Sequence, residues 1–531
     1  MSRVDLRIDN ARVVDGSGGP AFTGSVAVVD GRIAAADDDR PAIRTIDAGG
    51  AVVTPGFIDL HTHSDFTLPV FPAAEAMVRQ GVTTQVVGNC GFSPFPNPPE
   101  RKAELIDYTS FIDAGIPWDR WDDAAGFIAF LETLPLGCNI ALQVGLGTVR
   151  MSVMGFKRRP PRDSELAEMG RLVARSFEAG VIGVSSGLVY PPGSYAGTEE
   201  IVNLVSIAGR YGGFYSSHIR NEASSLVDAV GEALEIADRA DVALQLSHHK
   251  ALGRSNWGMV GTTLGLIDAA RLAGRDVLAD QYPYRAGSTG LTQVLPGWAL
   301  EGGVDAMRAA LRDPDTRGRI VHDMQASDTA AIRDFEPDAI LLAQIPDGPN
   351  QRYEGSYLSE VAAARGEDPI DTALGLLLDE GASILTVIFG MSEEDVRRVM
   401  AHPAVAIASD GWTLSPAAGG RPHPRSYGTY ARVLGTYVRD EGVLSLETAI
   451  HKMTALPARR LPGHERGLIA PGLVADLVVF DPDSVQDEAT FEDPHRFCSG
   501  VHHVVVGGVL AVEHGDATGA APGRVLRRVG A

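Results

Sequence analysis

The chain has 531 residues, of which 44% are hydrophobic and 21% are charged. This is the composition of an ordinary globular enzyme, and the length indicates two or three domains. The formal net charge of -22 argues against nucleic acid or an anionic membrane as a partner, because both require a basic face.

The first residues are polar and already strand-like, without the apolar core of a signal peptide. No apolar run approaches the ~20 residues needed to cross a bilayer. The three cysteines, Cys90, Cys138 and Cys498, are too few for a disulfide framework in so long a chain. We therefore expect a cytoplasmic protein with reduced thiols and no membrane partner.

Both ends of the chain are predicted to form β-structure. Apolar and polar residues alternate from Val4 to Ile8, and Asp30-Gly31 between two apolar runs is typical of a hairpin turn. The C-terminal part has similar apolar runs, with a turn at Gly507-Gly508. We expect residues 1–55 and 466–531 to pair into one small β domain.

Residues 56–465 alternate between short apolar runs and helical patterns. Alternating strands and helices predict a parallel sheet, and eight strands predict a closed (β/α)8 barrel of the TIM type. The helical pattern Ser164–Ala179 stops at Gly180, a residue type that often follows a helix. The predicted strands are Phe57–Leu60, Thr84–Gly88, Ile140–Val144, Val181–Ser185, Phe214–Ser217, Ala243–Ser247, Val277–Gln281 and Val405–Ser409.

Ile384–Phe389 is a ninth strand candidate, one more than the barrel needs. The stretch between Gln281 and Asp410 is also too long for a single strand–helix unit. We therefore expect an insertion at about residues 285–345. An insertion near the mouth of a barrel often serves as a lid.

Five side chains that can bind a metal, together with one carboxylate, follow predicted strand ends. Strand ends are where a (β/α)8 barrel builds its active site. Imidazole, thiolate and carboxylate together suit zinc better than magnesium or calcium, so we predict a zinc-dependent hydrolase. The six residues are His61, His63, Cys90, His218, His248 and Asp410.

The other cysteines, and the histidine next to His248, need separate interpretation. Cysteines in long chains are usually small buried apolar residues, and this suits Cys138 and Cys498. It does not suit Cys90, which lies in a glycine-bounded turn after a strand. His249 follows His248 directly and should face the other way, so we assign the ligand to His248.

Further polar residues around the strand ends are candidates for catalysis and substrate binding. Asp410 can bind a metal or act as general base toward water. Lys250 lies two residues after a predicted ligand, and Arg425 suits a carboxylate through its bidentate fork. Weaker candidates are Tyr190, Tyr282 and Ser288.

These motifs resemble those of the D-aminoacylases (N-acyl-D-amino-acid deacylases) of the amidohydrolase superfamily. The resemblance extends from about residue 50 to the C-terminus. Cys90 is its most specific feature, because most amidohydrolases bridge two metals with a carboxylate or a carboxylated lysine. The matching motifs are TPGFIDLHTHSD, VVGNCGFSP, SSGLVYPPG, SHIRNE, LSHHK, QYPYRAGST, ASDG, PHPRSYGTYARVLG and RGLIAPGLVADLVVFDP.

The resemblance implies a tight zinc site at Cys90, His218 and His248, and a second, weaker metal position. It implies Asp410 as general base and then acid, and Tyr190 as a group that polarises the scissile carbonyl. The second position would involve His61, His63 and Asp410. The substrate carboxylate would be held by Lys250, Tyr282, Ser288 and Arg425.

One position departs from the pattern. Relatives often carry a glycine–histidine pair where this chain has VGLGTVR, with Leu146 in place of the histidine. No predicted ligand is lost, so we expect activity to survive, with altered packing or specificity near that strand end.

The expected reaction is hydrolysis of an N-acyl-D-amino acid, with a preference for neutral or apolar side chains. We expect the side-chain pocket at residues 286–307, which contain no lysine or arginine. Arg285 and Arg308 flank this segment, one on each side. The segment offers Leu291, Val294, Leu295 and Trp298 instead, which could equally pack the insertion against the barrel.

Three alternatives remain open at this point. A cyclic amidase of the dihydroorotase or hydantoinase type would use the same barrel. A lactonase or a deaminase is also compatible, because a fold alone does not define chemistry. A catalytically silent binding protein is disfavoured because all six polar groups are present. The oligomeric state, the acyl group and the preferred amino acid stay undetermined.

Overall fold

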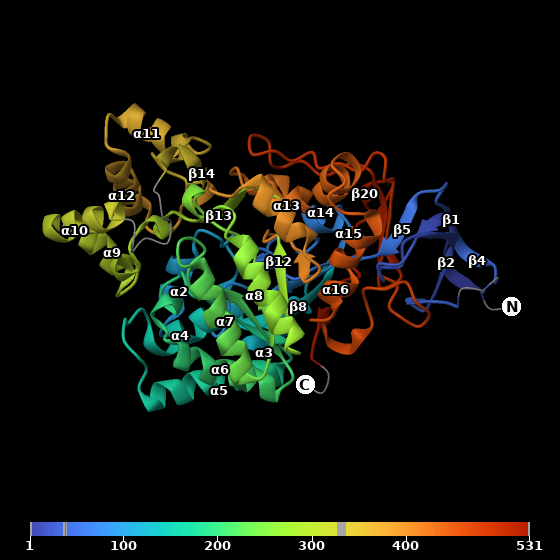
Figure 1. Cartoon of the computed structure of the whole chain (residues 1–531), viewed down its shortest axis with the longest axis horizontal. Coiled ribbons are helices and arrows are strands. Elements are labelled where there is room, and N and C mark those ends of the chain that lie inside the picture. The colour runs from blue at the N-terminus through green and yellow to red at the C-terminus, as the bar shows by residue number, and fades with distance from the viewer. Residues whose placement is uncertain (1–2, 36–37, 39, 327–335, 529–531) are drawn as a thin grey trace.

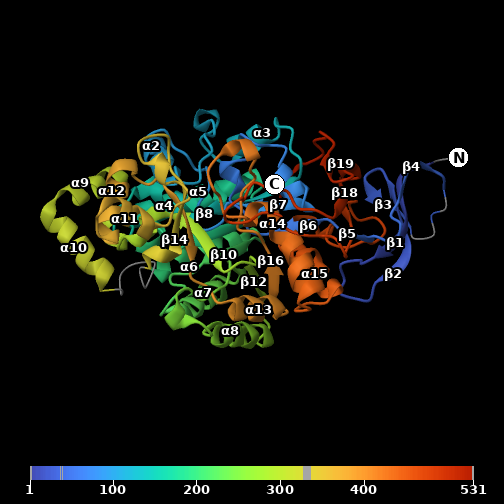
Figure 2. The ribbon, with the colours of Figure 1, turned by 90° about the horizontal axis from the view of Figure 1, so that it is seen from above.

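The computed structural model describes residues 3–35, 38, 40–326 and 336–528. Figure 1 shows three parts in a row, namely a small β-sheet that carries the N-terminus, a central barrel, and a helical lobe at the opposite end. The view from above in Figure 2 shows the same order. The barrel therefore lies between the β-sheet and the helical lobe.

The central sheet confirms the predicted barrel. Its eight parallel strands follow one another in chain order, from β6 to β12 and then β16. Their bounds are β6 (Phe57–Asp59), β7 (Val82–Val87), β8 (Asn139–Gly145), β9 (Gly183–Gly187), β10 (Phe214–His218), β11 (Ala243–Leu246), β12 (Val277–Gln281) and β16 (Val405–Ile407).

The first and last strands are joined just beyond their C-terminal ends. The backbone N–H of Asp410 donates to the carbonyl of His61 at 2.8 Å, and that of His63 donates to the carbonyl of Gly411 at 2.9 Å. The buried Asp59 carboxylate accepts a backbone N–H from each side of this junction. The closure of the barrel therefore determines where His61, His63 and Asp410 stand relative to one another.

Amphipathic helices cover the outside of the barrel. In α7, for example, Leu226, Val230 and Ala233 are buried at helical spacing. The α5 helix ends at Gly180, whose φ of 116° favours glycine. The helices are α1 (Glu75–Val78), α2 (Lys102–Thr109), α3 (Ala124–Leu131), α4 (Leu146–Met154), α5 (Asp163–Ala179), α6 (Thr198–Arg210), α7 (Leu226–Ala240), α8 (Val260–Leu272), α13 (Glu393–Ala401), α14 (Arg425–Arg432, continued by a π-helix over Val433–Asp440), α15 (Leu446–Met453) and α16 (Ala455–Ala458).

The insertion after β12 is a lobe with its own sheet and its own hydrophobic core. The surplus strand candidate Ile384–Phe389 is β15 (Leu385–Phe389) of this sheet and not a barrel strand, because it pairs antiparallel with β13 and β14. The lobe therefore extends well past the expected limit near residue 345. Its other elements are β13 (Ala286–Gly290), α9 (Val304–Arg312), α10 (Pro314–Gln325), β14 (Ile340–Gln344), α11 (Leu358–Arg365) and α12 (Pro369–Glu380).

The two ends of the chain meet in a second nine-stranded sheet, which we propose as a small domain made from residues 1–55 and 466–531. The hairpin at Asp30-Gly31 is present, with both residues at positive φ. The last strand, β21 (Val525–Leu526), departs from this plan and pairs with β8 of the barrel. The strands are β1 (Val4–Val13), β2 (Phe22–Val29), β3 (Arg32–Ile33), β4 (Ala42–Asp47), β5 (Val52–Pro55), β17 (Leu477–Phe480), β18 (Val501–Val506), β19 (Val509–Glu513) and β20 (Asp516–Ala517).

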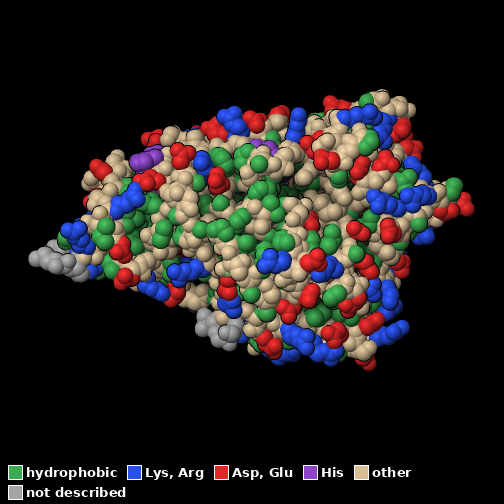
Figure 3. All heavy atoms as spheres, turned by 180° about the vertical axis from the view of Figure 1, so that it is seen from behind, with side chains coloured by type: hydrophobic (Ala, Val, Ile, Leu, Met, Phe, Trp, Pro, Cys, Tyr) green, Lys and Arg blue, Asp and Glu red, His purple; other side chains and the backbone are tan. Residues whose placement is uncertain are grey.

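No helix among the described residues combines the length and the apolar character needed to traverse a bilayer. On the face seen in Figure 3, acidic and basic side chains are mixed with one another around the edge, and the middle is largely hydrophobic and uncharged.

Candidate metal centre and substrate cavity

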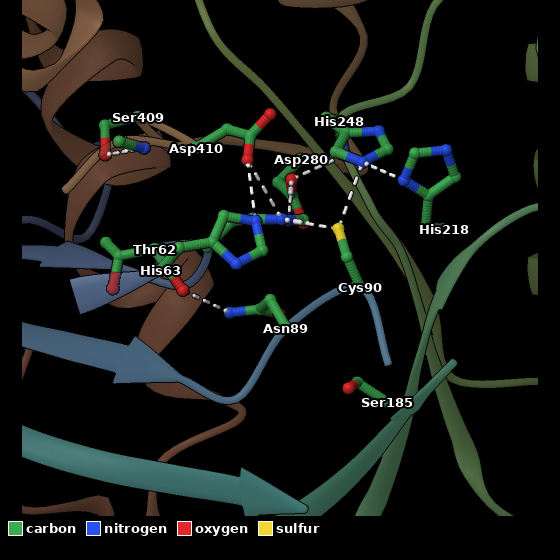
Figure 4. A network of polar contacts seen from close by, with 12 residues as sticks. Thr62, His63, Asn89, Cys90, Ser185, His218, His248, Asp280, Ser409 and Asp410 are labelled. Carbon is green, nitrogen blue, oxygen red and sulfur yellow. Dashed lines mark hydrogen bonds and ion pairs between the residues drawn. The ribbon is translucent and has the colours of Figure 1, made fainter. Parts of the chain in front are cut away.

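The barrel brings the predicted tight ligands together at the C-terminal ends of its strands (Figure 4). The Cys90 sulfur lies 3.4 Å from His248 Nε2, and His248 Nε2 lies 2.9 Å from His218 Nδ1. The ligand atoms of these three residues all lie within 4.8 Å of one another, and all three are buried. One ion could therefore contact all three.

The predicted weaker position lies beside this group. Asp410 Oδ1 is 3.2 Å from His63 Nε2 and 3.4 Å from His61 Nε2. His61 Nε2 is also 3.3 Å from the Cys90 sulfur. Compact groups of possible ligands form at His61, His63 and Cys90 and again at His61, His248 and Asp410. The thiol therefore lies where the two positions meet.

Three of these six residues have an unusual backbone conformation. Cys90, His248 and Asp410 have φ values of 54°, 35° and 51°. Such values are uncommon outside glycine and cluster at functional sites, where the surrounding structure imposes them. A Cβ added to Gly88 would lie 2.2 Å from the Gln143 carbonyl oxygen, so only glycine fits in the turn that carries Cys90.

The electrostatics favour two anionic ligands. Burial opposes ionisation of the Cys90 thiol, but the imidazoles of His61 and His248 outweigh it and lower its pKa well below the usual range. Burial likewise opposes ionisation of Asp410, and the guanidinium of Arg425 more than compensates, so the pKa of Asp410 is also lowered. A thiolate and a carboxylate among imidazoles suit a zinc dication.

Two carboxylates that our sequence prediction missed, the largely buried Glu222 and the buried Asp280, contact the predicted ligands. Glu222 Oε1 is 3.0 Å from His248 Nδ1 and accepts a hydrogen bond from Lys250 Nζ at 2.6 Å. Glu222 Oε2 is 3.7 Å from His218 Nε2. Carboxylates in this position orient a metal-binding imidazole and select its tautomer. The signal was present in the SHIRNE motif, where Glu222 follows His218 by four residues.

The second missed carboxylate is Asp280. It accepts the backbone N–H of His248 at 2.7 Å and a hydrogen bond from Gln245 Nε2 at 2.8 Å. Its Oδ1 also lies 3.2 Å from His61 Nδ1. The sequence did contain a signal for Asp280, because it lies inside the predicted buried strand Val277–Gln281. A buried charge needs a partner, so Asp280 had to contact a polar group.

The main cavity opens from the metal cluster toward the insertion. Tyr190, Lys250, Tyr282 and Ser288 line it together with ligand residues. Tyr190 Oη lies 3.2 Å from Thr289 Oγ1 of β13, so a strand of the inserted lobe forms part of the wall. The lobe is thus placed where a lid would be.

Arg425 is buried next to Asp410. It is not among the described residues that line this cavity. Its Nη1 lies 2.8 Å from Asp410 Oδ2, and its guanidinium carbon is 4.9 Å from the centre of the Tyr282 ring. Neither Nε nor Nη1 makes a hydrogen bond of good geometry. The guanidinium therefore keeps donor capacity beside the cavity.

The apolar residues expected to form a side-chain pocket mostly have a different role. Leu291, Val294 and Leu295 are buried in the core of the inserted lobe and are not among the described residues that line the cavity. The aliphatic cavity walls come instead from Val189, Leu252 and Ile388.

The other residues singled out in the sequence lie apart from the cluster. His249 Nε2 contacts Thr263 Oγ1 at 2.7 Å, so His249 faces away as predicted. Leu146 begins α4 and is buried in the barrel core. Cys138 is buried with its sulfur accepting from Gln85 Nε2, and all three cysteines are free.

A parallel eight-stranded barrel with imidazoles, a thiolate and an aspartate at its C-terminal rim has the architecture of a metal-dependent amidohydrolase. The model of the Amidohydrolase family matches residues 44–512. The chain therefore belongs to the amidohydrolase family.

Full-length relatives narrow this class. An N-acyl-D-glutamate deacylase of Alcaligenes xylosoxydans xylosoxydans is 37% identical, covering 99% of this chain and 97% of its own. A D-aminoacylase of the same organism is 38% identical and covers 99% and 98%. The resemblance inferred from the motifs is thus confirmed over nearly the whole chain.

A crystal structure of N-acyl-D-glutamate deacylase from Bordetella bronchiseptica matches with a TM-score of 0.84 and 33% identity, covering 99% of this chain and all of that one. That protein was crystallised with zinc and a phosphonate that mimics the tetrahedral intermediate. A D-hydantoinase matches at a TM-score of 0.55 and 14% identity over 99% of each chain, which shows a common fold alone.

The contacts of Glu222 predict its effect on metal binding. Glu222→Gln should weaken zinc binding by about 10–100-fold, because the amide no longer supplies an anionic acceptor to His248 Nδ1. Zinc affinity is measured by competition with a chromogenic chelator.

The matched control is Glu232→Gln, which removes another ion-paired glutamate, bound to Arg220 at 2.8 Å away from the cluster. It should leave zinc affinity unchanged. Equal zinc affinity in Glu222→Gln and the parent would show that Glu222 does not orient the ligands.

Proposed function

We propose that this protein is a zinc-dependent deacylase that hydrolyses N-acyl-D-amino acids to a carboxylate and a free D-amino acid. The observation that carries the proposal is the Cys90 thiolate at the centre of the ligand cluster, beside a cavity that contains a buried lysine. The deacylase relatives support the same substrate class.

The tight zinc site would consist of Cys90, His218 and His248, with a second, weaker position at His61, His63 and Asp410. Three protein ligands leave one coordination position open, as in catalytic zinc sites. A zinc ion held there supplies a Lewis acid that polarises the amide carbonyl and makes water more acidic.

The protein's own proton transfers would centre on Asp410. This carboxylate would take a proton from the attacking water and then deliver it to the amide nitrogen as the C–N bond breaks. Arg425 holds Oδ2 by its contact at 2.8 Å, which leaves Oδ1 facing the histidines. Tyr190 would donate a hydrogen bond to the carbonyl oxygen, since burial raises its pKa and the phenol keeps its proton.

The substrate carboxylate would bind at the cavity wall formed by Lys250, Tyr282 and Ser288. Lys250 is held in place by Glu222, its hydrogen-bond acceptor. We propose that Arg425 joins these residues through its Nε, which makes no hydrogen bond to the described residues.

We propose that the preferred side chain is neutral or apolar. Among the described residues that line the main cavity, Lys250 is the one lysine or arginine, and Glu222 already neutralises it. Arg285 is 65% exposed and lies 3.9 Å from Glu393, whereas Arg308 donates to backbone carbonyls of the lobe. A second substrate carboxylate would therefore lack a cationic partner, and burying it unpaired is costly.

A cyclic amidase is the principal alternative, because hydantoinases have the same fold. Assays against N-acetyl-D-amino acids and against hydantoins and dihydroorotate distinguish the two. Turnover of the cyclic amides alone would replace the proposed function. We also propose a cytoplasmic location, where Cys90 stays reduced.

Loss of the thiolate should remove metal and activity together. Cys90→Ala should lose tightly bound zinc, whereas His61→Ala or His63→Ala should lose less because they belong to the weaker position. Zinc content is measured by elemental analysis after dialysis, alongside turnover.

The control is Cys138→Ala, which removes another buried thiol outside the cluster and should retain both zinc and turnover. Full zinc content and a normal rate in Cys90→Ala would overturn the assignment of the tight site.

Replacing the proton carrier should separate chemistry from metal binding. Asp410→Asn preserves the shape of the side chain but cannot accept a proton, so turnover should fall by about 10²–10⁴-fold with zinc retained. The acidic limb of the pH–rate profile should disappear as well. A variant nearly as fast as the parent would assign water activation to another group.

The charge of the cavity predicts the order of substrates. Catalytic efficiency should be higher for N-acetyl-D-leucine, D-methionine and D-phenylalanine than for N-acetyl-D-glutamate and D-aspartate. The comparison is made with purified zinc-loaded enzyme. If the acidic pair is preferred, the proposed side-chain preference is wrong, and Arg285→Ala then tests whether that arginine moves inward to bind the second carboxylate.

A further inference from the structure

A cavity of about 420 Å³ lies at the end of the barrel opposite the metal cluster. Residues at the N-terminal ends of four adjacent strands, β9 to β12, line it. Ile182 and Asp276 come directly before β9 and β12, whereas Phe214 and Ala243 begin β10 and β11. The active site of such a barrel occupies the other, C-terminal face. The proposed deacylase reaction therefore makes no use of this cavity, although its volume suits a small organic ligand.

Basic side chains exceed acidic ones around this cavity, in a chain whose net charge is -22. Arg459, Arg460 and Arg528 line it, and Asp276 is the one acidic residue among the described residues that do. Asp276 Oδ1 is 2.9 Å from Arg459 Nη2, and its Oδ2 is 2.9 Å from Arg460 Nη1. One carboxylate thus serves two guanidiniums, and with histidine neutral the described lining residues carry an excess of two positive charges.

Arg460 has a donor that the described residues do not satisfy. Its side chain is only 2% exposed. Its Nη2 donates to the Leu244 carbonyl at 2.9 Å, but its buried Nε has no hydrogen-bond partner among the described residues. Buried donors in native proteins are almost always paired with protein, water or a ligand. An unsatisfied donor on a residue that lines a cavity therefore indicates an acceptor that enters from outside the chain.

Aromatic rings lie beside two of the three guanidiniums. The guanidinium carbon of Arg528 is 5.4 Å from the centre of the Tyr211 ring, and that of Arg460 is 5.9 Å from the centre of the Phe214 ring. Contact with a ring face orients an arginine without occupying its hydrogen-bond donors. Leu461 adds aliphatic surface to the wall. Oriented cations beside apolar and aromatic surface suit an organic anion better than a bare inorganic ion.

We propose that this cavity binds a phosphate monoester that carries a planar ring, at a site separate from the metal centre. The phosphate would contact Arg459, Arg460 and Arg528, and the ring would lie against Tyr211. A guanidinium fork matches two oxygens of a phosphate group. The excess of two positive charges matches a phosphate monoester, whose charge at pH 7 is about -1.5 to -2, better than a carboxylate with its single charge.

The test is isothermal titration calorimetry of the zinc-loaded enzyme with inorganic phosphate, phenyl phosphate and benzoate. Phenyl phosphate should bind more tightly than inorganic phosphate, because its ring can contact Tyr211. Benzoate should bind most weakly, because it carries one charge. Any other order of affinity, or no binding of either phosphate, would overturn the proposal.

Arg459→Gln and Arg528→Gln locate the bound phosphate. Each variant should raise the Kd for phenyl phosphate at least about tenfold, because each removes a hydrogen bond between charged groups. The matched control is Arg275→Gln, which removes the same charge from a half-exposed arginine that pairs with Asp238 and is not among the described lining residues. Its Kd should equal that of the parent.

Two results with these variants would refute the assignment. Equal weakening in all three would show a general effect of surface charge. Unchanged affinity in both Arg459→Gln and Arg528→Gln would place the phosphate elsewhere, for example at the metal centre.

A second pair of variants applies if the arginine variants do not fold. Pro462 lines the same cavity and begins a short 3-10 helix, so its replacement breaks no hydrogen bond of the barrel. Pro462→Glu places a carboxylate near the arginines and should raise the Kd for phenyl phosphate at least about tenfold more than Pro462→Gln, which has the same shape without the charge. Equal Kd values in the two variants would contradict a phosphate site here.

Discussion

The burial of the Cys90 thiolate among imidazoles is the interaction on which the rest of the site depends. The turn that carries it has a left-handed backbone at Cys90 and a glycine before it that no other residue can replace. A buried anion of this kind requires positive charge around it. His61 and His248 provide this within hydrogen-bonding distance, and a zinc ion in the cluster would provide more. The surrounding structure therefore serves to hold several ligand atoms close together.

Three carboxylates, two of them buried and one largely buried, surround the cluster, and each has different partners. Asp410 is held by Arg425, Glu222 by Lys250, and Asp280 by backbone and amide donors. Lys250 and Arg425 are also the cations proposed for the substrate carboxylate. Under the proposed function, substrate binding and ligand orientation would share the same ion pairs, so a change in one would affect the other.

The two cavities beside the metal cluster differ in the parts of the protein that form them. The main cavity is built jointly by the barrel and the inserted lobe, whereas a smaller one, which Cys90 and Tyr190 also line, is lined by described residues of the barrel alone. Ser288 and Thr289 of the lobe line the main cavity together with barrel residues, so under the proposed function the lobe would contribute to amino-acid specificity.

The sequence alone determined the barrel, because each strand is a short apolar run ended by a polar group, and it determined the ligand candidates, because they stand at those ends. It did not reveal Glu222 and Asp280 as supports, since their partners lie on neighbouring strands. Nor could it assign Ile384–Phe389, because an apolar run has the same pattern in a barrel as in a lobe. The sharing of Cys90 and Tyr190 by two cavities was decided by tertiary structure, since a cavity is the space left between segments distant in sequence.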